Sequence, residues 1–189
     1  MLRSKCLFVG LVVIMTGCER TPPTTPRGAD EPNFRVLKLF GGQAGWSPIA
    51  RRTRVEAFRV DPNWQGESDP EKAAEEHDRK FAGYSILSGP IDVEKKTANA
   101  LAMILADPAT YDWESAKGCE FQPGVGIRFI AADSSTEILF CFSCDELQIL
   151  RDGKSVGHED TDTARAELVE IVKKIFPDDK VIQGLDANG

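Results

Sequence analysis

Short apolar segments separated by turn residues follow one another from Phe34 onward, and their spacing predicts a mixture of strands and helices. Runs of β-branched, aromatic and other apolar residues predict strands over 35–40, 54–60, 84–88, 127–131, 137–142 and 147–151. The glycine-rich segment 40–48 is expected to be a loop, because glycine and proline end regular structure. Asp69-Pro70 suits the start of a short polar helix, expected over 69–80.

Two longer segments carry apolar residues at helical spacing, and each ends just before a proline. The first follows Asp92 and ends before Pro108, with Val93, Thr97, Ala100, Leu101, Ile104 and Leu105 on one face. The second ends before Pro177 and carries Ala164, Leu168, Ile171, Val172, Ile175 and Phe176. Acidic residues precede this second stripe and lysines close it, which suits the helix dipole.

Turn residues connect the later strands in a way that predicts hairpins. Asp133-Ser134-Ser135 separates two strand segments, and Asp152-Gly153 is a strong two-residue turn pair. Residues 138–142 are apolar at every position, so their strand is expected at the centre of a sheet. The predicted fold is a single α+β domain over 34–185, an antiparallel β-meander packed on two main amphipathic helices, followed by a tail over 186–189.

The first 18 residues have the order of an export signal. Arg3 and Lys5 precede an apolar run over 6–15, and two small residues lead into Cys18. A run of about ten apolar residues is too short to span a bilayer, which needs about 20. We therefore expect this segment to be removed on export.

Ile14-Met15-Thr16-Gly17-Cys18 resembles the lipobox of bacterial lipoproteins. The resemblance implies that Cys18 carries a diacylglycerol thioether, becomes the first residue and holds the protein on the bacterial cell membrane, facing the envelope. Glu19 follows in place of aspartate, which by the enterobacterial sorting rule favours the outer membrane where the cell has one. Residues 19–33 contain four prolines and no large apolar residue, so we expect a disordered tether.

The net charge of the domain limits the kinds of molecule that it is expected to bind. Two of the 23 Lys and Arg lie in residues 1–18 and none of the 30 Asp and Glu does, so removing this segment takes the formal charge from −7 to −9. The short run Arg51-Arg52-Thr53-Arg54 is the only basic cluster. Nucleic acid is therefore not an expected partner, because phosphates are bound by basic surfaces. The expected partner is the membrane, through the lipid on Cys18.

Three cysteines besides Cys18 follow the signal segment, and a disulfide suits an oxidising envelope. If the first hairpin centres near Ser134, Cys144 lies near Gly124 and Cys119 lies a few residues beyond the ladder. This register favours Cys119–Cys144, with Cys119–Cys141 as the competitor. The remaining cysteine is expected to be a small buried core residue.

A zinc site is the alternative for the same residues, since Cys119, Cys141, Cys144 and His158 would supply four ligands. Thiol–disulfide catalysis is not favoured, because the residues after the Cys-x-x-Cys pair alternate like a strand rather than starting a helix. The chain has two histidines and neither a Gly-x-Ser-x-Gly nor a His-Glu-x-x-His motif. No catalytic residue and no cofactor is assigned.

The segment 111–185 is similar to uncharacterised bacterial proteins that share a Cys-x-Phe-x-Pro stretch, here starting at Cys119, followed by Cys-Phe-x-Cys, here 141–144. This resemblance implies no activity, only that the three cysteines act together. The expected function is a non-catalytic binding or scaffolding role in the cell envelope. The alternative is a metal- or thiol-dependent enzyme centred on Cys119, Cys141 and Cys144.

Overall fold

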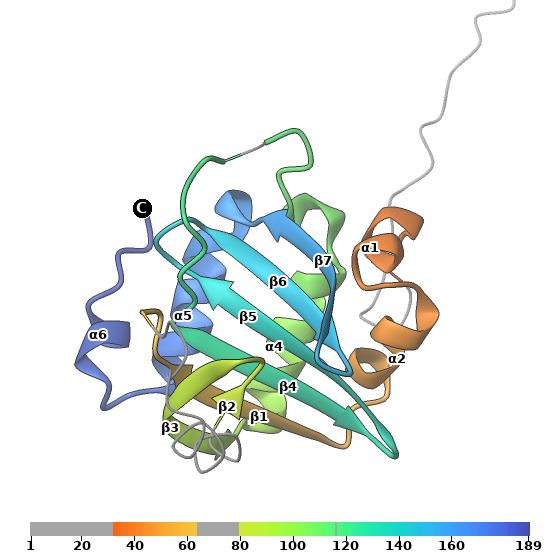
Figure 1. Ribbon diagram of the computed structural model, residues 1–189, viewed down its shortest axis with the longest axis horizontal. Helices are drawn as coiled ribbons and strands as arrows, with labels where there is room; N and C mark the ends of the chain where they lie inside the picture. The colour runs from red at the N-terminus through yellow and green to blue at the C-terminus, as the bar shows by residue number, and fades with distance from the viewer. Residues whose placement is uncertain (1–31, 64–79, 116) are drawn as a thin grey trace, which may run out of the picture.

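The computed structural model describes residues 32–63, 80–115 and 117–189 (Figure 1). Their centre is a sheet of seven strands in the order β2-β3-β1-β4-β5-β6-β7, in which every neighbouring pair is antiparallel. The strands are Arg54–Val60 (β1), Lys80–Phe81 (β2), Tyr84–Asp92 (β3), Val125–Ala131 (β4), Ser134–Cys141 (β5), Glu146–Arg151 (β6) and Lys154–Asp160 (β7). The fold is α+β. The expected signal with Cys18, nearly all of the tether and nearly all of the helix expected over 69–80 lie outside the described residues.

The later strands form a meander in which two-residue turns join β4 to β5 and β6 to β7, and a four-residue turn over 142–145 joins β5 to β6. Asp152 and Gly153 both have positive φ and close the β6–β7 hairpin at the position that the sequence predicts. The β4–β5 turn comes earlier than expected, at Ala132 and Asp133, because Ser134 and Ser135 already pair in the ladder. The register prediction is therefore wrong in detail: Val125, not Arg128, lies opposite Phe140.

Two helices, Lys95–Ala106 (α4) and Arg165–Ile175 (α5), cover one face of the sheet (Figure 1). Alternate residues of the central strands point to this face, so that Ile127, Ile138 and Ile149 lie side by side across β4, β5 and β6. All three are fully buried in the main hydrophobic core. Within the described residues, no helix is both long enough and apolar enough to cross a membrane.

The segment after Asn33 is helical, which corrects the strand expected over 35–40 and the loop expected over 40–48. The Asn33 side chain accepts a hydrogen bond from the Val36 N–H and caps Phe34–Leu39 (α1). Gly42, with positive φ, precedes Gln43–Ala50 (α2). Helix α1 packs on β7, where a Cβ atom at Gly157 would lie 1.9 Å from the Leu39 carbonyl oxygen. Close backbone packing, which residue patterns do not show, favours the helix here.

Three further elements differ from the expectation. Strand β3 continues through Gly89 and cis-Pro90 and pairs with β1 as far as Asp92, although it was expected to end at Ser88. Strand β7 was not predicted, because Val156 is its only large apolar residue. A short helix, Lys180–Gln183 (α6), follows Pro177 and is capped by the Asp179 carboxylate. Two 3-10 turns, Pro108–Thr110 (η1) and Asp162–Ala164 (η2), flank the main helices.

A second apolar cluster lies on the face of the sheet opposite α4 and α5. The β2–β3 hairpin folds in front of β1 and β4 (Figure 1) and places Phe81 over Gly126, where a Cβ atom would lie 2.4 Å from the ring. Phe121, from the segment before β4, packs against the same cluster. The buried members of this second cluster are Phe58, Val60, Phe81, Leu139 and Leu150. This face is therefore covered near β1 and β4 but keeps polar side chains toward β7.

Candidate functional site

Polar side chains gather at one end of β6 and β7, on the face opposite the helices. The register pairs Glu146 with Asp160 and Gln148 with His158, and strand alternation directs these four side chains to one face. Glu146, His158 and Asp160 border a shallow depression of about 230 Å³, which we call the β6–β7 cleft. Its lining residues are Ser115, Lys117, Glu146, His158, Glu159 and Asp160.

Glu146 is the most unusual residue of the cleft, because its side chain is only 8% exposed. Its Oε2 atom lies 3.4 Å from His158 Nε2, but the two groups are not aligned for a hydrogen bond. In the described part of the chain, Oε2 has no hydrogen-bond partner. A buried carboxylate oxygen without a partner is costly in free energy, so Glu146 calls for a function or a ligand.

Asp160, on the neighbouring strand, is a second buried acidic residue of the cleft. The residue is 4% exposed, and its Oδ2 atom also lacks a hydrogen-bond partner among the described residues. Lys117 Nζ is 3.9 Å from Asp160 Oδ1, but this ammonium donates hydrogen bonds to Asp162 Oδ2 at 2.6 Å and to the Cys144 carbonyl at 2.5 Å. Lys117 therefore neutralises Asp160 only in part.

The electrostatics of the cleft favour positive charge. Burial alone would lower the pKa of Lys117, but its hydrogen bond to Asp162 and the nearby acidic groups raise this pKa above its usual value. Burial raises the pKa of Glu159, and the neighbouring Asp160 carboxylate adds to the rise. The raised pKa of Lys117 reflects the negative charge around it, whereas the raised pKa of Glu159 is mainly an effect of burial.

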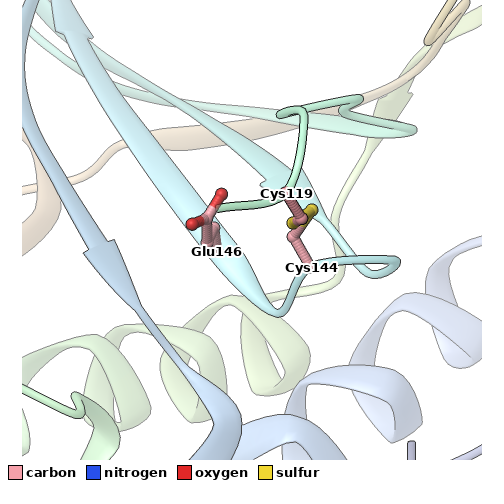
Figure 2. A group of neighbouring side chains, drawn as sticks. All are labelled: Cys119, Cys144 and Glu146. Carbon is pink, nitrogen blue, oxygen red and sulfur yellow. A yellow bond between two sulfur atoms is a disulfide. The ribbon is translucent and has the colours of Figure 1, made fainter. Parts of the chain in front are cut away.

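A disulfide joins Cys119 to Cys144 beside Glu146 (Figure 2), with 6.2 Å between the Cα atoms. The two sulfur atoms and a Glu146 carboxylate oxygen all lie within 4.8 Å of one another. The Cys144 Sγ atom is also 3.3 Å from the Glu120 carbonyl oxygen. Of the two pairings weighed from the sequence, the structure thus contains Cys119–Cys144.

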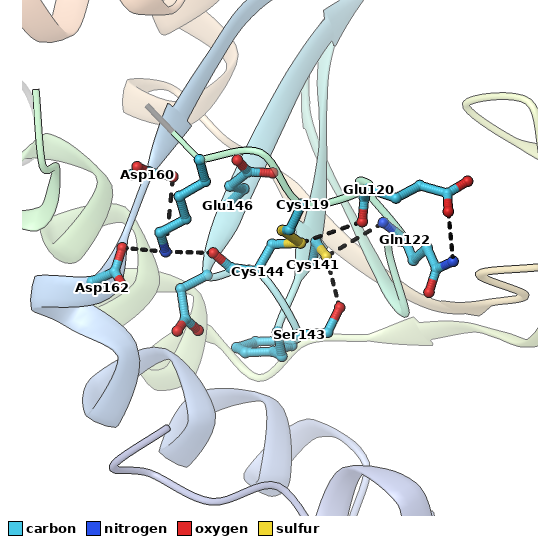
Figure 3. The surroundings of a disulfide bond; sticks show 12 residues. Cys119, Glu120, Gln122, Cys141, Ser143, Cys144, Glu146, Asp160 and Asp162 are labelled. Atoms are coloured by element: carbon cyan, nitrogen blue, oxygen red, sulfur yellow. Dashed lines mark hydrogen bonds and ion pairs between the residues drawn. A yellow bond between two sulfur atoms is a disulfide. The ribbon is translucent and has the colours of Figure 1, made fainter. Parts of the chain in front are cut away.

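Cys141 does not belong to this group. It is free and buried at the end of β5, where its sulfur accepts a hydrogen bond from the Gln122 N–H at 3.4 Å and lies 3.2 Å from Ser143 Oγ (Figure 3). The structure therefore does not bring together the four zinc ligands expected from the sequence. Of those four residues only Cys119 and Cys144 lie together, with Glu146 as their third neighbour, while His158 contacts only Glu146 of this group.

The sequence analysis missed Glu146 and Asp160 as site residues. The available signal is an acidic residue in a strand that is otherwise largely apolar, as Glu146 is in Glu-Leu-Gln-Ile-Leu-Arg. Asp160 is harder to recognise as a site residue from the sequence, because acidic residues surround it there. Only the cross-strand register shows that the two carboxylates face each other.

Rigid elements hold the cleft residues in place. Arg165, at the start of α5, donates hydrogen bonds to the Phe142 carbonyl at 2.7 Å and to the Asp145 carboxylate, which fixes the turn between β5 and β6. The Thr161 N–H and hydroxyl both bond the Asp145 carbonyl. Phe121 meets the His158 ring edge-on, with 5.1 Å between ring centroids. These contacts fix the turn that precedes Glu146 and the ring of His158.

The cleft offers oxygen and nitrogen ligands for a cation. In the described part of the chain, no serine, threonine or cysteine hydroxyl or thiol is hydrogen-bonded to His158, so the nucleophile–base pair of acyl-transfer enzymes is not formed there. An imidazole nitrogen and carboxylate oxygens are ligands of Zn²⁺ and related divalent ions. Comparison with family models, with curated proteins and with solved structures gives no match for this chain.

Proposed function

We propose that this protein is a lipid-anchored bacterial envelope protein whose domain binds a divalent metal cation in the β6–β7 cleft and does not catalyse a reaction. The observation that carries this proposal is the buried Glu146 oxygen, which lacks a hydrogen-bond partner and lies 3.4 Å from His158 Nε2. A bound cation would satisfy this oxygen and remove the free-energy cost of its burial.

The separation of the two atoms supports a shared metal ion. In a tetrahedral zinc site with bonds of about 2.0–2.1 Å, neighbouring oxygen and nitrogen ligands lie about 3.3 Å apart. Glu146 Oε2 and His158 Nε2 are already at 3.4 Å. Asp160, with its own unpaired oxygen, adds a second carboxylate to the same cleft.

The lipid anchor is supported by the sequence before the domain. The export signal, the lipobox-like residues ending at Cys18 and the proline-rich segment 19–33 would place the domain at the end of a tether on the membrane. In this proposal, α4 and α5 are the two main amphipathic helices and stabilise the back of the sheet. The opposite face, with the cleft, is then available to the envelope.

Calorimetric titration with Zn²⁺ tests the proposed function. The full chain, purified in detergent with its disulfide intact, should bind one Zn²⁺ with a Kd in the micromolar range. Glu146→Gln and His158→Ala should each weaken binding at least tenfold, because each removes one ligand. The matched control is Asp133→Asn, which changes an exposed acid in the distant β4–β5 turn. Absence of binding in the unmodified chain, or equal weakening by the control, would overturn the proposal.

A further inference from the structure

We infer that the Cys119–Cys144 disulfide and a four-ligand Zn²⁺ site are alternative states of the same cleft, so that reduction of the disulfide converts a weak metal site into a tight one. The inference deepens the proposed function and rests on it, because the reduced site keeps Glu146 and His158 as ligands. The cysteine thiolates supply the other two.

The positions of the ligand atoms support this conversion. With Zn–S bonds of about 2.3 Å, a tetrahedral site places its sulfurs about 3.8 Å apart and each sulfur about 3.5 Å from an oxygen or nitrogen ligand. Both sulfurs already lie within 4.8 Å of a Glu146 oxygen, whereas His158 is outside this group of three and approaches it through Glu146, with 3.4 Å between Nε2 and Oε2. The imidazole must therefore move toward the sulfurs when the ion binds. The two sulfurs of a disulfide are about 2.0 Å apart, so they must separate by roughly 2 Å to take two tetrahedral positions around the ion.

The two cysteines differ in a way that favours reversible opening. Cys119 is exposed on a segment without helix or strand structure, whereas Cys144 and Glu146 are buried. A thiolate reductant can therefore approach the Cys119 sulfur, and Cys144 is the group that leaves. Cys144 then stays in place, because the turn that carries it is fixed to α5 through Asp145 and Arg165.

The reaction balances with a dithiol as the reductant. One reductant thiolate attacks Cys119 and forms a mixed disulfide, while the electrons of the broken sulfur–sulfur bond go to Cys144 as a thiolate. The second reductant thiol then displaces Cys119, and the reductant leaves as a disulfide. Both protons of the dithiol end in solution once Zn²⁺ is bound by the two thiolates.

The two states differ in charge and in ligand type. The oxidised cleft offers a carboxylate and an imidazole, whereas the reduced cleft adds two thiolates, which are the stronger ligands for Zn²⁺. By linkage, bound Zn²⁺ must also make the disulfide harder to re-form. The cleft therefore couples metal occupancy to the thiol redox state of the envelope.

The test titrates the full chain in detergent with Zn²⁺ against a competing chelator, with and without a phosphine reductant. One Zn²⁺ per chain should be held at least a hundredfold more tightly after reduction, and Co²⁺ should then give a thiolate charge-transfer band. Cys119→Ser should abolish both effects, and because Cys119 is exposed, this change leaves the core intact. Cys141→Ser is the matched control and should preserve them, since Cys141 lies outside the group.

The outcomes separate this inference from the proposed function. If the oxidised chain binds Zn²⁺ and reduction changes nothing, the inference is wrong while the proposed function stands. If only the reduced chain binds, the redox-dependent site is supported and the carboxylate–histidine site of the oxidised chain is rejected. An equal loss of affinity in Cys141→Ser and Cys119→Ser would also overturn the assignment of ligands.

Discussion

Arg59, in the first strand of the sheet, forms an ion pair with Asp179, 120 residues later at the start of α6, with 2.7 Å between Nε and Oδ2. The Arg59 side chain is 7% exposed and also donates to the Gly124 carbonyl. Asp179 accepts hydrogen bonds from the N–H groups of Val181 and Ile182. One carboxylate thus joins the C-terminal helix to the sheet.

Replacing Asp179 by Asn should lower the free energy of unfolding by about 2 kcal/mol, because the change leaves the Arg59 guanidinium buried without its counter-charge. Chemical denaturation at neutral pH measures this loss. Asp178→Asn is the matched control, since Asp178 is the exposed neighbour. This change should leave the free energy of unfolding nearly unchanged. Equal effects of the two changes would show that the ion pair contributes nothing.

The same carboxylate predicts a pH dependence. Burial alone would raise the pKa of Asp179, but hydrogen bonds from Ile182, Arg59 and Val181 and the Arg59 charge lower it below its usual value. A folded-state pKa below the unfolded one, which is about 3.9, gives stability that is complete above about pH 5. This stability is lost as the pH falls through the folded-state pKa. Unfolding titrations from pH 7 to pH 2 should show a shallower loss for Asp179→Asn than for the unmodified chain.

The disulfide should stabilise the oxidised protein substantially. It joins cysteines separated by 25 positions, and a closed loop of this length contributes about 3.5 kcal/mol in the chain-entropy model. The double change Cys119→Ser and Cys144→Ser should lower the free energy of unfolding by about that amount in oxidising buffer. In reducing buffer the difference should shrink to near zero. Cys141→Ser, the control, should have the same small effect in both buffers.

Gly126 should not tolerate a side chain. A Cβ atom there would lie 2.4 Å from Phe81, so Gly126→Ala forces the β2–β3 hairpin away from the sheet. Overpacking of this kind costs about 1–3 kcal/mol, measurable as a lower melting temperature. Gly118→Ala is the control, because nothing lies within 4 Å of a Cβ atom at Gly118. If both variants have the same melting temperature as the unmodified chain, Phe81 does not pack on Gly126.

Glu146→Gln should have opposite effects on stability and on metal binding. In the oxidised, metal-free protein, the change removes a buried charge whose Oε2 atom has no hydrogen-bond partner in the described residues, so stability should rise by about 1 kcal/mol. With saturating Zn²⁺, the order should reverse, because only the unmodified chain gains binding free energy. Thermal melts with and without Zn²⁺ measure both effects. A destabilised metal-free variant would indicate a structural role for Glu146.

The lipid anchor has its own test. Cys18→Ser should abolish incorporation of labelled fatty acid and release the protein from the membrane fraction, because the thioether cannot form. Cys6→Ser is the control, since Cys6 lies within the apolar run of the expected signal. Membrane association that persists without fatty acid in Cys18→Ser would indicate an uncleaved signal instead.

Local residue patterns predicted the central strands of the sheet but not its edge strands. The helix after Asp92 and the turn at Asp152-Gly153 were predicted because residues close together in the sequence determine them. The helix follows from the spacing of apolar residues, and the turn follows from the residue types within it. Helix α1 was missed because Arg35 to Phe40 fits a strand, and the packing against Gly157 that favours a helix comes from residues far along the chain. Strand β7 is polar, so its ladder with β6 defines it rather than its own pattern.

The candidate site was predictable only in part. The sequence placed Cys119, Cys144 and His158 among the candidates through residue type and spacing. Glu146 and Asp160 enter through the pairing of β6 with β7, which depends on the complete sheet. Strand alternation does not exclude Cys141, because it pairs with Glu146 across β5 and β6 and so lies on the same face. Its sulfur instead contacts the Gln122 N–H and the Ser143 hydroxyl, which spacing alone does not reveal.

The segment before β4, residues 117–123, contains no helix or strand and is fastened to the domain through a few side chains, chiefly those of Lys117, Cys119 and Phe121. In such a segment, the rate at which backbone amides exchange with solvent is set by local opening rather than by global unfolding. Breaking one sulfur–sulfur bond removes one of these attachments. Reduction of the disulfide is therefore expected to increase the local opening of the whole segment 117–123, which makes its amide exchange a readout of the oxidation state of the cleft.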